Sequence, residues 1–186
     1  MRKKTLWITR TALFLAILVL AQLFGSRLGG GIGQQLITGS LVNLVLVIAG
    51  ITAGYASGLT VALLSPVLAF LIGVGPKFMQ VVPVIMLGNA VIALVGVLVF
   101  RACSRMPSGR RYAFRACGLV AAAGVKACVL YVGVVLLVLP MLSVPDAAKA
   151  TLSLMFSWPQ FVTGSMGGVL AVLLAPSLLR AQHEIV

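Results

Sequence analysis

The sequence predicts an all-α integral membrane protein in which six transmembrane helices form one compact bundle, with the N- and C-termini in the cytoplasm. Hydrophobic residues make up 61% of the chain and charged residues only 9%, which gives a mean hydropathy of +1.19. A soluble domain of 186 residues has too little interior to bury that much apolar surface. Segments in lipid must also satisfy their own backbone hydrogen bonds, so the long apolar segments are predicted to be helices.

Six apolar segments follow one another along the chain and form a single predicted domain, residues 1–186. They cover approximately residues 6–24, 36–55, 59–74, 81–101, 113–139 and 158–179. The first follows a basic N-terminus and has the outline of a signal peptide, but its small-residue cleavage pattern is weak, so it is predicted to be retained. The third is short and contains Pro66, which predicts a tilted, kinked or partly re-entrant helix.

The basic residues predict how these helices are oriented. With the N-terminus inside, the cytoplasmic side receives Arg2, Lys3, Lys4, Arg10, Arg101, Arg105, Arg110, Arg111, Arg115 and Arg180. The outer side, with loops 25–35, 73–80 and 140–157, receives only Arg27, Lys77 and Lys149. This asymmetry is a positive-inside signal, so the net charge of +12 is interpreted as topology and not as nucleic-acid binding. For the arginines of residues 101–115, contact with lipid headgroups or a partner is the alternative interpretation.

Lys126 is the most informative residue, because it lies near the centre of the apolar segment 113–139. A lysine at that depth costs about 2.5–3.5 kcal/mol on insertion scales. The two acidic residues, Asp146 and Glu184, lie outside the apolar segments and cannot pair with it there. Lys126 must therefore face protein, water or an anionic ligand, which points to a carrier or receptor for an anion.

Other polar residues gather toward the outer ends of the predicted helices, and Lys126 is the deepest of them. Buried amides and charges need partners, so this one-sided distribution predicts a polar cavity open to the exterior. Asn43 and Asn89 are alternatively interhelical hydrogen-bonding residues, and Trp158 is alternatively an interfacial anchor. The candidate binding residues are Lys126, Asn89, Asn43, Gln35, Gln80, Tyr131, Trp158, Gln160, Lys77 and Arg27.

The sequence contains few residue patterns that would indicate an enzyme. The predicted helices carry no carboxylate cluster for a metal, and the single histidine, His183, lies in the terminal tail. No phosphate-binding Gly-rich motif follows a strand, so ATP hydrolysis would need a partner. The three cysteines lack metal-ligand spacing and are interpreted as small packing residues. No metal or cofactor is predicted. An intramembrane Ser–Lys enzyme stays open, although no motif marks its serine.

Four short motifs lie in the first half of the chain. The first helix reads Arg-Thr-Ala-Leu-Phe-Leu-Ala from Arg10, and the second begins Gly-Ser-Leu-Val-Asn from Gly39. A Gly-Val-Gly-Pro turn starts at Gly73, and the fourth helix reads Pro-Val-Ile-Met-Leu-Gly-Asn-Ala from Pro83. Together these motifs resemble the substrate-binding S-component of an energy-coupling factor (ECF) vitamin transporter. Length, six helices and both ends inside also fit, so the resemblance covers nearly the whole chain.

The resemblance implies a subunit of a prokaryotic plasma-membrane importer, surrounded by membrane lipids. It implies partners as well: a transmembrane coupling subunit that docks on the Ala12 and Ala16 face, and two ATPases attached to that subunit. Packing of these alanines within the protein's own bundle is the alternative. Pantothenate, nicotinate and folate-like compounds suit a cationic pocket, with pantothenate preferred, while cobalamin, a queuosine precursor and a neutral flavin stay open. An accessory membrane protein without a ligand is the remaining alternative.

Overall fold

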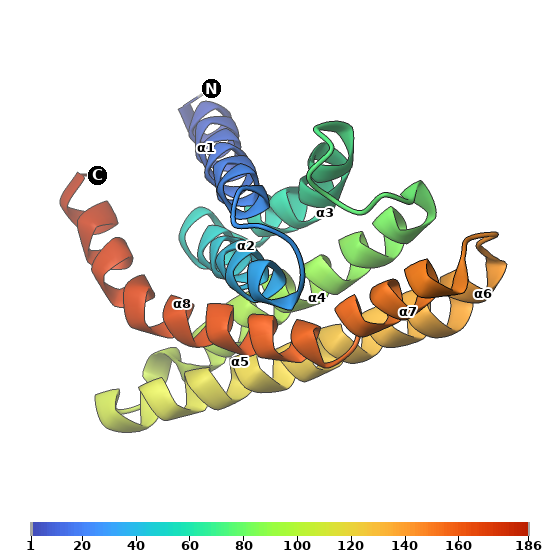
Figure 1. Ribbon diagram of the computed structural model, residues 1–186. Helices are drawn as coiled ribbons and strands as arrows, with labels where there is room; N and C mark the ends of the chain where they lie inside the picture. Colours follow the sequence, from blue (N-terminus) through green and yellow to red (C-terminus); the bar gives the residue numbers. More distant parts are fainter. Residues whose placement is uncertain (1, 186) are drawn as a thin grey trace.

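Helices account for all the regular structure in the described part of the chain, as predicted (Figure 1). The computed structural model describes residues 2–185, and the side chains of residues 4–181. The side chains of Arg2, Lys3, His183 and Glu184, considered above, lie outside that range. The long helices are α1 (Arg2–Ser26), α2 (Ile32–Ala53), α3 (Tyr55–Leu71), α4 (Val82–Ala102), α5 (Ser108–Leu130) and α8 (Trp158–Ile185).

Within residues 2–185, five helical stretches are long and apolar enough to cross a membrane, and α3 is the shorter sixth. At 1.5 Å per residue α3 is about 25 Å long, somewhat less than the roughly 30 Å hydrocarbon core. Its backbone stays helical through Pro66. The six-span count and the inside–outside orientation therefore stay predictions, whereas the multi-helix membrane architecture is confirmed.

The segment after α5 continues as one extended rod. A π-helix, η3 (Tyr131–Val138), and a short turn, α6 (Leu139–Met141), prolong α5 without a break (Figure 1). The rod begins earlier and ends slightly later than the predicted segment 113–139. Its length means that it reaches beyond the hydrocarbon at one or both ends.

A helix in the predicted outer loop 140–157 was not expected. This helix, α7 (Asp146–Met155), packs against η3, α6 and α8. Its residues are good helix formers, and Asp146 complements the dipole in its first turn. The prediction of a loop was wrong because only segments long enough to span lipid were sought, and α7 has 10 residues.

Close packing of small residues holds α2 at the centre of the bundle, in contact with α1, α3, α4 and α8. A Cβ atom added to Gly167 of α8 would lie 2.6 Å from the Ser40 carbonyl oxygen of α2. A Cβ atom on Gly39 of α2 would lie 2.8 Å from the Thr163 side chain. The two helices can approach this closely only because both positions lack a side chain, and this approach brings their polar residues together.

Two apolar clusters divide the interior. The larger lies where α1 to α5 and α8 meet and includes Leu46, Ile92 and Leu119. The smaller includes Val81, Leu130 and Phe156 and lies between η1 (Met79–Val81), the α5–η3 rod and the α7–α8 junction. The polar cavity described below borders this second cluster.

Candidate functional site

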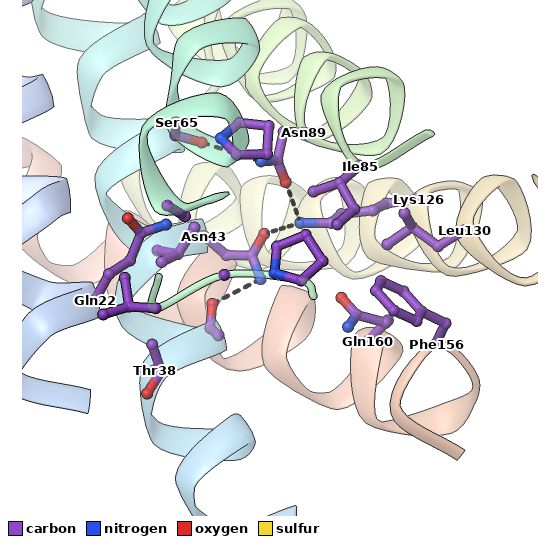
Figure 2. Close-up of a pocket in the computed structure, with 17 residues that line it drawn as sticks. Gln22, Thr38, Asn43, Ser65, Ile85, Asn89, Lys126, Leu130, Phe156 and Gln160 are labelled. Atoms are coloured by element: carbon purple, nitrogen blue, oxygen red, sulfur yellow. Dashed lines mark hydrogen bonds between the residues drawn. The ribbon is translucent and has the colours of Figure 1, made fainter. Parts of the chain in front are cut away.

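Lys126 of α5 is buried, with 3% of its side chain exposed. Its ammonium group donates hydrogen bonds to two amide oxygens: Asn43 Oδ1 of α2 at 2.6 Å and Asn89 Oδ1 of α4 at 2.8 Å (Figure 2). Residues from three helices therefore converge on one cation. All three were candidate binding residues in the sequence, and the structure brings them into direct contact.

The two amides are oriented by the groups that their nitrogens bind. Asn43 Nδ2 donates to the Gly39 carbonyl at 2.8 Å and lies 3.5 Å from Thr163 Oγ1. Asn89 Nδ2 donates to Ser65 Oγ at 3.2 Å. Because both nitrogens are engaged elsewhere, both oxygens face the ammonium group.

This arrangement holds a positive charge without a negative partner. No ion pair forms among the side chains that the structure describes, and Asp146, the acidic residue among them, is exposed on α7. Hydrogen bonds to a charged group contribute about 1.5–3 kcal/mol each, so two of them can offset an insertion cost of about 2.5–3.5 kcal/mol. An ammonium group has three N–H donors, and two are used here. One donor and the full charge are left for a ligand.

A cavity of about 180 Å³ opens beside Lys126 (Figure 2). It is surrounded by the turn of residues 74–76, by the C-terminal parts of α1, α3 and α5, and by the N-terminal parts of α2, α4 and α8. Its polar lining consists of Gln22, Thr38, Asn43, Ser65, Asn89, Lys126 and Gln160, and much of the rest is apolar, including Ile85, Leu130 and Phe156. Such a site can bind a small molecule that has an anionic group and an apolar part.

Hydrogen bonds to the last residue of α7 hold the part of the cavity lining that lies near α8. Gln160 Nε2 donates to the Met155 carbonyl oxygen at 3.0 Å, and Gln35 Nε2 of α2 donates to the same oxygen. Met155 is the last residue of α7, so two side chains satisfy a carbonyl that the helix leaves free. Phe156 follows directly, is buried, and lines the cavity.

Other candidate binding residues lie away from this cavity. Three of them are exposed: Gln80, Lys77 and Arg27. Gln35 bonds the Met155 carbonyl at the end of α7 and does not line the cavity. Tyr131 and Trp158 border a separate apolar groove, where 42% and 51% of their side chains are exposed. The roles of all these residues in binding stay predictions.

The reason for Tyr131's position is helical geometry. It follows Lys126 by five residues, which places it about 140° around the helix axis. The same turn that directs Lys126 inward directs Tyr131 outward. The predicted depth of a residue in the membrane therefore does not determine which side chains share a cavity.

Four polar or aromatic residues of the site were not among the candidates: Thr38, Ser65, Phe156 and Thr163. Gln22, a polar residue near the outer end of the first predicted helix, was not among the candidates either. Serine and threonine are too frequent in membrane helices to be selected on type alone. For Thr163 a signal did exist, since it follows Gln160 by three residues and so lies on the same face of α8.

The structure does not provide a Ser–Lys pair at this site. Ser65 accepts its hydrogen bond from Asn89, and Asn89 lies between it and Lys126. A catalytic dyad needs the lysine within hydrogen-bonding reach of the serine hydroxyl. Lys126 instead uses its donors on the two asparagines.

The first helix presents a free face. Ala12 and Ala16 are exposed, whereas Thr11 is buried and its hydroxyl lies 2.8 Å from Ser57 Oγ of α3. Within an apolar stretch of 18 residues in each helix, only 11% of the residues of α1 are buried, against 44% of those of α2. The two alanines therefore do not pack inside this bundle, and the alternative of internal packing is not supported.

The three cysteines occupy different environments. Cys103 is buried, whereas Cys117 and Cys128 are exposed on α5. The interpretation of all three as packing residues is therefore wrong for the last two. They lie on the part of α5 that is turned away from the bundle.

A comparison with known protein families gives one match. The sequence model described as "ECF transporter, substrate-specific component" matches residues 7–179. No curated protein and no solved structure matches the chain. The family match covers α2 to α5 completely and most of α1 and α8, and so includes the alanine face of α1 and Lys126 of α5.

Proposed function

The chain belongs to the ECF transporter substrate-specific component family, and from this premise we propose that it captures a small carboxylate-bearing, vitamin-like molecule on the outer side of the membrane and delivers it inward. As a family member it is a multi-pass membrane protein that binds substrate for transport and is not an enzyme. Family membership also implies a membrane coupling subunit and ATPases as partners.

One observation carries the choice of an anionic substrate: Lys126 is buried, bonded to two amide oxygens, and has no counter-ion among the described side chains. A carboxylate in the cavity would supply that counter-ion and use the remaining N–H donor. A cationic vitamin such as thiamine would instead meet an uncompensated like charge, so it is disfavoured.

The size of the cavity narrows the choice further. At about 180 Å³ it lies below the 300–1,000 Å³ usual for drug-sized ligands. This supports a compact compound such as pantothenate or nicotinate over folate or cobalamin. Pantothenate is our preferred candidate because its branched part suits the apolar side of the cavity, formed by Ile85, Leu130 and Phe156.

The charge distribution supports an outward-facing cavity and six membrane spans. Residues 74–76 and Phe156, which line the cavity, belong to the connections that carry few basic residues. The opposite end of the bundle carries η2 (Cys103–Arg105) and the arginines in the first turns of α5, residues 110–115. By the positive-inside rule that end is cytoplasmic, so substrate enters from the exterior.

For the coupling subunit we propose the exposed face of α1 that contains Ala12 and Ala16. Two small residues four positions apart leave a shallow groove on one helix face, into which another helix can pack closely. The exposure of both alanines in the isolated chain supports this assignment.

A thermal-shift screen tests the proposed function. Detergent-purified protein is heated with B vitamins and their precursors, and the screen is repeated with Lys126→Met. A carboxylate that raises the midpoint of unfolding in the parent protein and not in the variant supports the proposal. If no compound in the panel shifts the midpoint, capture of a vitamin-like anion is contradicted.

A further inference from the structure

We infer that the substrate carries a hydrogen-bond donor, a hydroxyl or amide N–H, beside its anionic group, and that Gln160 Oε1 accepts this bond. The inference rests on the proposed function and adds a second polar contact to the one made by Lys126. It excludes carboxylates that have no such donor.

The orientation of the Gln160 amide follows from its partner. Its nitrogen lies 3.0 Å from the Met155 carbonyl oxygen, and two oxygens cannot share a hydrogen bond without a proton between them. The nitrogen must therefore face Met155. The amide oxygen then lies on the other side, toward the cavity, as Figure 2 shows.

This oxygen is an acceptor without a protein donor. Among the described residues no hydrogen bond reaches Gln160 Oε1, and the oxygen is not enclosed by protein atoms. The cavity thus has a cationic donor at Lys126 and a neutral acceptor at Gln160. A ligand that fills the cavity but has no donor would displace water from this acceptor without replacing the hydrogen bond, which would weaken binding.

Gln35 provides the internal contrast. Its nitrogen donates to the same Met155 oxygen, but its own oxygen is buried and it does not line the cavity. Gln35 and Gln160 are therefore equivalent in holding the end of α7. Only Gln160 also presents an acceptor to a ligand.

The test compares carboxylates with and without a donor on the full-length protein. Pantothenate and biotin carry hydroxyl or N–H donors, and nicotinate and lipoate carry none. Dissociation constants are measured by calorimetry for the parent protein, Gln160→Leu and Gln35→Leu. We expect binding by at least one donor-bearing probe, with at least about tenfold weaker binding in Gln160→Leu.

The Gln35→Leu control separates loss of α7 anchoring from loss of a direct hydrogen bond to the ligand. Gln35→Leu removes one bond to Met155 without removing the cavity acceptor, so it is expected to weaken the same probe much less than Gln160→Leu. Equal losses in the two variants would overturn the inference, because anchoring of α7 would then explain both. Pantothenyl alcohol, which has the donors without the carboxylate, should bind weakly and remain sensitive to Gln160→Leu.

The outcomes also separate this inference from the proposed function. Tight binding of nicotinate or lipoate that depends on Lys126 would overturn the donor requirement and leave anion capture standing. Binding of pantothenyl alcohol as tight as that of pantothenate would contradict anion capture and leave the acceptor role standing. Absence of binding by all five probes would count against both.

Discussion

Asn89 contacts Lys126 through its oxygen, at 2.8 Å, and Ser65 through its nitrogen, at 3.2 Å. It therefore links the short helix α3 to the charge on α5 through α4. Asn43 makes the corresponding link from α8 to that charge through α2. The charge of Lys126 is thus stabilised by dipoles from the surrounding helices and not by an opposite charge. A site built this way keeps its attraction for an anion.

Lys126→Met should weaken binding of an anionic ligand more than binding of a neutral analogue. The variant removes the charge and the free N–H donor but keeps a side chain of similar length. Loss of a charge-assisted bond corresponds to about 10- to 100-fold in dissociation constant. Calorimetry with pantothenate and pantothenyl alcohol measures the difference. Lys149→Met on α7 is the matched control, and equal losses for the two compounds would remove the case for anion recognition.

Asn89→Asp should strongly weaken anion binding without unfolding the protein. The new carboxylate would neutralise Lys126, and the Ser65 hydroxyl can rotate to donate to it. We expect at least about tenfold weaker binding and a change in unfolding free energy of less than about 1 kcal/mol.

Asn43→Asp is the contrasting variant for that experiment. Its carboxylate would lie against the Gly39 carbonyl, which cannot rotate to donate, so this variant should also lose stability. Chemical denaturation in detergent, read alongside ligand titration, separates the two cases. Unimpaired anion binding by Asn89→Asp would show that the uncompensated charge is not what the ligand recognises.

Replacement of Ala12 and Ala16 by leucine should block assembly with the coupling subunit and leave ligand binding intact. The longer side chains would fill the groove on α1 that another helix needs for close approach. Co-purification with the coupling subunit and ATPases measures assembly, and thermal shift measures binding. Ala121→Leu, at an exposed position of α5, is the control. Loss of ligand binding together with assembly would mean that the α1 face is structural.

Gly167→Ala should destabilise the protein by about 1–3 kcal/mol, because the added methyl group would meet backbone atoms of α2. It should also weaken anion binding, since it separates α8 from the Ser40 to Asn43 region. Gly124→Ala offers a matched control on α5, where the nearest atom, Phe161 Cε2, would lie 3.9 Å away. Its unfolding midpoint should stay level or rise slightly. A stable Gly167→Ala variant would contradict the close α2–α8 packing.

Cysteine labelling should confirm the orientation. In a background without native cysteines, Gly30→Cys in the α1–α2 connection and Gly109→Cys at the start of α5 both place the new side chain in open space. A membrane-impermeant maleimide added to intact cells should label the first and not the second. The reverse pattern would invert the predicted topology.

Much of the fold follows from local properties of the chain, and the sequence predicted it for that reason. Hydropathy and length identify helices because a segment in lipid must satisfy its backbone bonds internally. The special status of Lys126 was equally visible, since no acidic residue lies in any apolar segment. The amphipathic helix α7 was not visible by these criteria, because it does not span the membrane and its helical form is stabilised by packing on η3, α6 and α8.

The composition of the candidate site depended on the tertiary structure. Whether Asn43 and Asn89 face Lys126, and whether Gln160 rather than Gln35 reaches the cavity, depends on the rotation of each helix about its axis. That rotation is set by contacts between residues distant in sequence, such as Gly39 against Thr163 and Gly167 against Ser40. The sequence alone therefore determined that a buried cation needs partners, and only the packing of α2, α4 and α8 around α5 decided which residues those partners are.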